Sequence, residues 1–227
     1  MTLKEELASS LAIGAASARV NLVPMLVLQS AAVGGAVAYF LSPVVRTLLE
    51  PVAEWHRSWG WCSAFLSQAF FCGLIPGAFL LCIRSLRPPH LLRSVVAQAV
   101  WCGCFGVAND ALYRGLADLY GDRTTLLSLI AKTAFDQVVW SVFVVTPLNA
   151  VFFFWLGRDF SFVRLRDEWP HRFFRRLVLP NLISNWIVWI PVSLSMYSFP
   201  QPLQIHVNGI ACAFWVLMCL QIGRRSN

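Results

Sequence analysis

Several polar side chains in this sequence occur within long apolar stretches, where they could carry chemistry. Lys132 and Asp136 are four residues apart, so a helix would place them on one face, where their charges could pair. Polar groups are costly inside a membrane and usually face a bundle interior or a watery cavity. Six residues are therefore candidates for a polar core or lumen: Gln68, Gln98, Lys132, Asp136, Gln137 and Asn185.

Two interpretations of these six residues stay open. As structural residues they would hydrogen-bond neighbouring helices, each contributing about 1 kcal/mol or less. As functional residues they would line a passage for small solutes. For Lys132 and Asp136 the corresponding alternatives are a structural ion pair at the membrane boundary and a role in gating or solute contact. His206 is expected to be a packed or interfacial residue rather than a ligand.

The sequence carries no motif of a known catalytic or metal site. The GxSxG, HExxH and Walker patterns do not occur, so we expect no catalytic residue, no metal ligand, no cofactor and no enzymatic activity. The seven Cys lie in or beside apolar stretches, and we interpret them as small apolar residues. The basic residues form no stripe suited to nucleic acid, so we expect no nucleic-acid partner.

The composition predicts an integral membrane protein. Hydrophobic residues make up 58% of the chain and charged residues 13%, and the mean hydropathy is +0.64. Soluble domains carry about 25% charged residues, so this chain has too little polar surface for water. Six segments approach the length of about 20 residues that a membrane-spanning helix needs. They are residues 22–41, 61–83, 91–108, 134–156, 177–196 and 203–222.

These segments predict an all-α fold, a polytopic transmembrane bundle of about six apolar helices that forms one integrated domain in the lipid bilayer. If all six segments cross, thirteen of the 18 Lys and Arg residues fall on the side of the two termini and five on the other side. Such an asymmetry is typical of the cytoplasmic side of a membrane. Trp55, Trp59 and Trp61 precede the second segment, as expected of an aromatic belt at the lipid–water boundary.

Small residues indicate where helices could approach one another closely. Gly73 and Gly77 are four residues apart and flank Pro76. Gly34 and Gly35 lie in a second run of small residues. We expect a helix–helix contact at each of the two places.

Three patches from about residue 93 to the C-terminus resemble one family of membrane proteins. The residues that match its pattern are Gly106, Tyr113 and Leu116, then Lys132, Asp136 and Gln137, then Trp169, Pro170, Asn185, Trp186, Trp189 and Pro191, followed by Pro200 and Trp215. In order and spacing they resemble the Mpv-seventeen / PMP-twenty-two family, the twenty-two-kilodalton peroxisomal membrane protein type. The chain looks like a divergent member, since Asp110 replaces the family's His and Gln204 its Arg.

The resemblance implies a core of about four membrane helices in residues 91–227, preceded by residues 1–90 with two further membrane helices. It also implies a peroxisomal or mitochondrial inner membrane in a eukaryote, or the plasma membrane of a bacterium. Some family members look like weakly selective channels for small solutes or metabolites, and this is the function we expect. The alternative is a structural or scaffold protein of membrane homeostasis without transport activity. Small solutes and a second copy of the chain are the expected partners besides lipid.

The basic asymmetry makes the topology testable. We expect both termini and the basic loop of residues 158–176 on one side of the membrane. Accessibility labelling of single Cys residues in tags at each terminus, in sealed vesicles, measures this. Labelling of the two termini from opposite sides would rule out six crossings.

Overall fold

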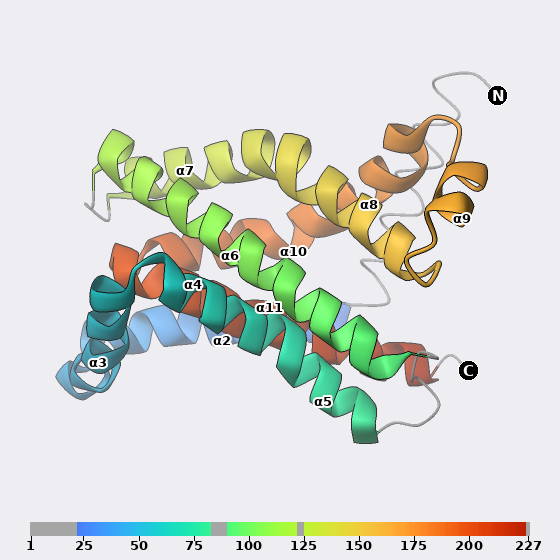
Figure 1. The fold of residues 1–227 in the computed structure, drawn as a ribbon. Coiled ribbons are helices and arrows are strands. Elements are labelled where there is room, and N and C mark those ends of the chain that lie inside the picture. Colours follow the sequence, from blue (N-terminus) through green and yellow to red (C-terminus); the bar gives the residue numbers. More distant parts are fainter. Residues whose placement is uncertain (1–21, 83–89, 122–124, 226–227) are drawn as a thin grey trace. The chain divides into compact units, whose positions relative to one another are not determined.

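The computed structural model describes residues 22–82, 90–121 and 125–225, and this part of the chain is helical without a strand (Figure 1). The elements, with η for π-helical stretches, are α2 (Leu22–Leu41), α3 (Pro43–Trp59), α4 (Trp61–Gln68), η1 (Ala69–Leu74), α5 (Ile75–Cys82), α6 (Leu91–Tyr120), α7 (Leu126–Ala134), η3 (Phe135–Val145), α8 (Thr146–Leu156), α9 (Phe162–Asp167), η4 (Phe174–Val178), α10 (Leu179–Tyr197) and α11 (Gln201–Arg225). The predicted all-α class is confirmed.

Three helical stretches among the described residues are long and apolar enough to cross a membrane. They are Trp61–Leu81, Leu91–Tyr120 and Leu126–Leu156. A fourth candidate is the pair formed by α2 and α3, which are bent by 104° at a short break. Three to four candidate spans suggest a membrane protein, whereas the six crossings predicted from the sequence are not confirmed and stay a prediction.

The chain forms two compact units that do not follow the order of the sequence. One unit comprises residues 133–191 with 1–23, and the other comprises residues 24–132 and 192–227. The helices α7 and α10 each continue from one unit into the other. The second unit contains helices from both sides of residue 90, the position where the family resemblance placed a division.

The second unit is held together by the close packing of α6 against α4, η1 and α5. A Cβ atom added to Gly73 would lie 2.3 Å from the Cα of Ala99, and one added to Gly77 would lie 2.5 Å from Val95. The expected contact at Gly73 and Gly77 is therefore confirmed. The second small-residue surface is not a contact among the described residues, because a Cβ on Gly34 or Gly35 meets nothing within 4 Å.

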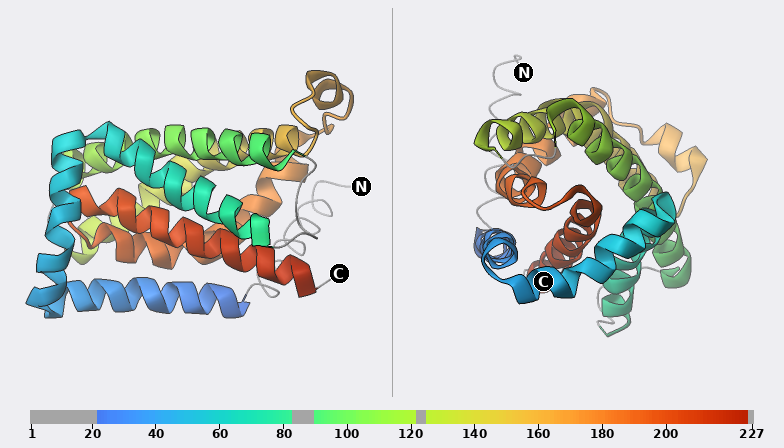
Figure 2. Two further views of the ribbon diagram at one scale, coloured as in Figure 1. Left: turned by 60° about the horizontal axis from the view of Figure 1, so that its bottom comes forward. Right: turned by 90° about the vertical axis from the view of Figure 1, so that its left-hand side faces the viewer.

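Helix α3 is amphipathic and crosses the ends of its neighbours α2, α4 and α11 (Figure 2). The Ser42 hydroxyl caps its start by accepting the Val45 N–H at 3.4 Å. Glu50, Glu54 and Arg57 form ion pairs on the exposed face. The opposite face is buried in a core cluster whose members are Ala36, Ala53, Phe199 and Leu203. The sequence analysis did not expect this helix, because its mean hydropathy is low.

A glycine turn joins α3 to α4. Gly60 has φ of +50°, a backbone conformation that favours glycine over residues with a Cβ. Its N–H donates to the carbonyl of His56 at 2.8 Å, and its own carbonyl accepts the hydroxyl of Ser63 at 2.7 Å. The turn therefore brings the last turn of α3 and the first turn of α4 together.

One backbone hydrogen-bond donor is missing at Pro76 in the helical stretch formed by α4, η1 and α5. Proline has no N–H, so it cannot donate to the carbonyl of Cys72 four residues earlier. The side chain of Gln98 on α6 replaces the missing donor, because its Nε2 donates to that carbonyl at 2.9 Å. The π-helical stretch η1 immediately precedes this position, as is common where the regular helical bonding is disturbed.

The bond from Gln98 can be tested in a double-mutant cycle with Pro76. Gln98→Leu leaves the Cys72 carbonyl without that donor and should cost about 1–3 kcal/mol of stability. In a Pro76→Ala background the new N–H can serve the carbonyl, so the same change should cost clearly less. Thermal unfolding in detergent measures both costs.

Pro147→Ala, which alters a proline on α8 instead, is the matched background and should leave the cost of Gln98→Leu unchanged. Equal costs in all three backgrounds would show that Gln98 does not compensate for Pro76.

Candidate functional site

A buried carboxylate lies at the centre of the most polar cluster of the second unit. Asp110 on α6 is fully buried. Its Oδ2 accepts Arg114 Nε at 2.8 Å, and its Oδ1 lies 3.1 Å from His56 Nε2 on α3. Gln201 of α11 donates its Nε2 to Oδ1 at 3.2 Å. We call Asp110, His56, Arg114, Ser63 and Gln201 the Asp110 cluster.

The hydrogen bonds around His56 determine where its protons lie. Because Ser63 donates its hydroxyl hydrogen to the Gly60 carbonyl, the Ser63 Oγ must accept from His56 Nδ1, which lies 2.8 Å away. Nδ1 therefore carries a hydrogen. Nε2 lies within reach of both Arg114 Nη2, at 2.9 Å, and the Asp110 carboxylate.

The protonation state of His56 thus selects its partner. In the neutral ring, Nε2 is an acceptor and receives the hydrogen bond of Arg114 Nη2. In the charged ring, Nε2 is a donor and binds the Asp110 carboxylate, so Arg114 Nη2 must turn elsewhere. Arg114 has room to turn, since its side chain is 41% exposed.

The line Ser63–His56–Asp110 contains the three residue types of a serine hydrolase triad, but its geometry is not suited to that chemistry. In a hydrolase the serine is reachable by substrate and donates its proton to the histidine. Here Ser63 is fully buried and donates to a backbone carbonyl instead. Ser63 is therefore a partner that orients the His56 ring.

A second histidine extends the cluster into the unit. The rings of His56 and His206 meet edge to face, with centroids 5.4 Å apart. The ring of Trp55 stacks on that of His206, with centroids 5.3 Å apart. Nδ1 of His206 lies 2.9 Å from Ser67 Oγ. Nε2 of His206 is buried and has no hydrogen-bond partner among the described residues. His206 is thus packed, as the sequence analysis expected.

The cluster lies close to one end of the apolar part of α6. From Leu91 to Asp110 the helix rises about 29 Å, which is about the thickness of a bilayer's hydrocarbon core. If Leu91 marks one boundary of the hydrocarbon, Asp110 therefore lies near the other and Arg114 beyond it. The amphipathic α3 covers this end, in the manner of a helix that lies in a membrane interface.

Two of the six candidates from the sequence lie in the second unit and bond to backbone. Gln68 is buried, its Nε2 donates to the Ile205 carbonyl at 2.8 Å, and its Oε1 accepts from Cys72 at 3.0 Å. It packs against Gly106, where any Cβ would lie 2.6 Å from its side chain. Gln98 serves the Cys72 carbonyl, as described above. Both amides thus join two helices of one bundle.

Three further candidates lie together in the first unit. Gln137 Nε2 donates to Asp136 at 3.3 Å, and Asn185 Nδ2 donates to Gln137 Oε1 at 3.3 Å. Trp186 Nε1 donates to the Gln137 carbonyl at 2.8 Å. Lys132 is buried but belongs to the second unit, so its predicted ion pair with Asp136 stays a prediction.

Some residues that carry the family resemblance have clear packing roles. Tyr113 and Leu116 are buried, and the ring of Tyr113 meets Tyr197 edge to face at 5.5 Å. Trp169 is stacked on Phe173 at 4.8 Å. Pro191 lies inside α10. The remaining family positions are Gly106 on α6, Trp189 on α10, Pro170 and Pro200 in loops, and Trp215 on α11, whose side chain lies outside the described residues.

The sequence pattern does not predict the Asp110 cluster. The third predicted segment ends at residue 108, so Asp110 and Arg114 lie outside the apolar stretches whose polar residues are candidates. Their spacing of four residues is the same signal that singled out Lys132 and Asp136. Their partner His56 could not be inferred, since only the fold brings it to α6.

Comparison with models of known protein families, with curated proteins and with solved structures finds no match. The resemblance to the Mpv-seventeen / PMP-twenty-two family therefore rests on the patches of the sequence itself.

The partners of Asp110 make a stability prediction. Asp110→Asn should cost about 1.5–3 kcal/mol, because the buried His56 and the partly exposed Arg114 lose the carboxylate that they contact. Asp118→Asn, an exposed change on the same helix, should stay within about 0.5 kcal/mol of wild type. Denaturation in detergent, followed by circular dichroism, compares the two.

Arg114→Gln combined with Asp110→Asn should cost less than the two single changes added together, because the double variant buries no unmatched charge. Additive costs would contradict the ion pair.

Proposed function

We propose that this chain is an integral membrane protein that lets small solutes cross the bilayer, and that the contact of His56 with the Asp110 cluster controls their passage. The proposal takes the six apolar segments as crossings. It places the chain as a divergent member of the Mpv-seventeen / PMP-twenty-two family, in a peroxisomal or mitochondrial inner membrane or in a bacterial plasma membrane.

The observation that supports a transport role is the buried Asp110 cluster in an otherwise apolar helix bundle. Ionisable residues within membrane helices are costly, and they commonly mark ion, proton or solute pathways. A bundle that needed only adhesion could use apolar packing and a few amides instead.

The suggested control follows from the two partners of His56 Nε2. This atom lies 3.1 Å from the Asp110 carboxylate and 2.9 Å from Arg114 Nη2, so His56 joins α3 to α6. We therefore expect α3 to hold the end of the bundle closed while His56 keeps these partners.

A second candidate is a structural membrane protein without transport. The observation in its favour is that Gln68 and Gln98 donate their amides to backbone carbonyls of neighbouring helices. Asn185 likewise joins two helical stretches, through the side-chain oxygen of Gln137. In a structural protein these polar residues would hold neighbouring helices together, and the Asp110 cluster would hold α3 against α6.

Solute flux across vesicles distinguishes the two functions. Purified protein in liposomes should release entrapped sorbitol faster than protein-free liposomes do. His56→Gln weakens the contact between α3 and α6 and should make release roughly fivefold faster, since a hydrogen bond contributes about 1 kcal/mol.

His90→Gln, which changes an exposed histidine before α6, is the matched control and should release sorbitol at the wild-type rate. Release no faster than from empty liposomes would favour the structural function. Release at the wild-type rate in His56→Gln would show that transport does not depend on the Asp110 cluster.

A further inference from the structure

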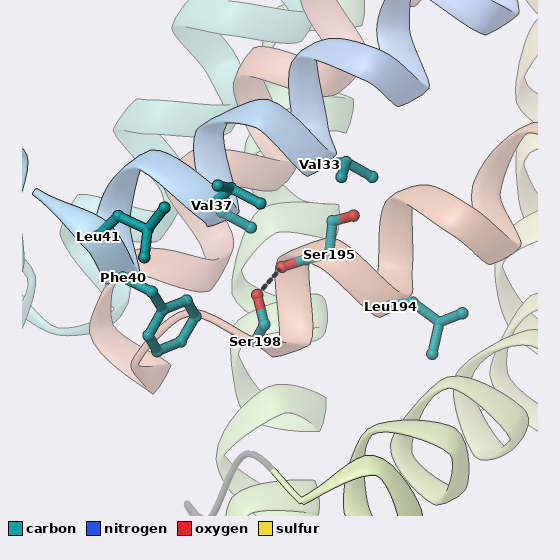
Figure 3. Close-up of a pocket in the computed structure, with 8 residues that line it drawn as sticks. Val33, Val37, Phe40, Leu41, Leu194, Ser195 and Ser198 are labelled. Atoms are coloured by element: carbon teal, nitrogen blue, oxygen red, sulfur yellow. Dashed lines mark hydrogen bonds between the residues drawn. The ribbon is translucent and has the colours of Figure 1, made fainter.

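An apolar groove runs along the outer side of α2 in the second unit. It has a volume of about 390 Å³ and lies between five residues of α2 and three residues near the end of α10. Val33, Val37 and Phe40 from α2 lie beside Ser195 of α10 and beside Ser198, which directly follows that helix (Figure 3). Val33, Val37 and Phe40 are about half exposed, so the groove is open at the surface.

The two serines do not make the groove a polar site. The hydroxyl of Ser198 donates to the Ser195 carbonyl at 2.5 Å, so its hydrogen is used within α10 (Figure 3). The remaining lining is almost entirely hydrocarbon. A ligand that fits here must itself present hydrocarbon, since a polar group would lose its water without gaining a partner.

The dimensions of the groove fit one leaflet of a bilayer. From Val33 to Leu41, α2 rises about 12 Å, and half of the hydrocarbon core measures about 15 Å. The Leu41 end lies at the 104° bend where α2 gives way to the amphipathic α3. Since α3 is suited to lie in the interface, the groove extends from the interface into the hydrocarbon.

A basic residue lies at the interfacial end. Arg46, in the first turns of α3, donates Nη2 to the Phe40 carbonyl at 3.4 Å, which holds its guanidinium beside the groove. The acidic residues Glu50 and Glu54 are bound by Arg57 instead. A guanidinium has five N–H donors and binds phosphate well, so Arg46 complements an anionic headgroup.

We infer that this groove binds one acyl chain of an anionic glycerophospholipid, with the lipid phosphate on Arg46. The chain would lie along Val37 and Phe40 toward Val33, and the headgroup would sit at the bend between α2 and α3. This inference does not depend on the transport function, because it concerns the lipid-facing side of α2 rather than the Asp110 cluster.

The site can be tested with lipids of identical chains and different headgroups. Protein in detergent is supplied with phosphatidylglycerol or phosphatidylcholine, and native mass spectrometry counts the bound molecules. Wild type should retain one phosphatidylglycerol in preference to phosphatidylcholine. Arg46→Gln should reduce that preference by about tenfold, the loss of one charge-assisted bond.

Filling the groove tests the chain-binding part. Val37→Trp should abolish retention of both lipids. If that variant is unstable, Val33→Trp replaces it, with the same expected result. Val27→Trp, on an exposed part of α2 away from the groove, should behave as wild type. A phosphatidylglycerol with a photoreactive acyl chain should label residues 33–41 and 194–198.

Unchanged lipid retention in both groove-filling variants, or labelling elsewhere on the chain, would overturn the inference. Loss of a dimer in these variants, with lipid retention intact, would assign the groove to a second copy of the chain.

Discussion

A carboxylate without access to water needs hydrogen-bond partners for both of its oxygen atoms. At Asp110 these partners connect α6, α3 and α11 of the second unit. Arg114 comes from the same helix, one turn along, and supplies a positive charge. Gln201 brings the start of α11, and His56 brings the end of α3. The position of His56 in turn requires the Gly60 turn. Losing any one partner would leave polar atoms buried without compensation.

The backbone meets the same constraint. Hydrocarbon offers no hydrogen bonds, so every interrupted helical bond must be satisfied from within the protein. At Pro76 the missing donor is replaced by Gln98 from α6. Gln68 can reach the Ile205 carbonyl because Gly106 leaves space for its side chain. Glycine, proline and glutamine at these places therefore depend on one another, although they are far apart in the sequence.

The sequence predicted apolar helices well and their polar connections poorly. The first predicted segment, residues 22–41, has the same bounds as α2 because its apolar residues are continuous. The third segment ended too early, since Asp110 and Arg114 lower the local hydropathy although α6 continues to Tyr120. Helix α3 was missed for a similar reason, because an amphipathic helix has no long apolar run. The sequence pattern suggested the Gly73 contact but could not show that Ala99 would meet it.

The spacing of Asp110 and Arg114 has a consequence for how the protein is made. A charged residue in a membrane helix is costly to insert, by about 2.5–3.5 kcal/mol at the helix centre and by less near the helix end, where Asp110 lies. Gln201 and the rest of α11 are synthesised long after α6, so they are not present when α6 meets the membrane. Arg114 is on α6 itself, one helical turn from Asp110, and the two charges can neutralise each other as soon as that turn forms. The helix thus brings its own counter-ion for Asp110 to the boundary of the bilayer, and the partners from other helices are added later, as the bundle assembles around it.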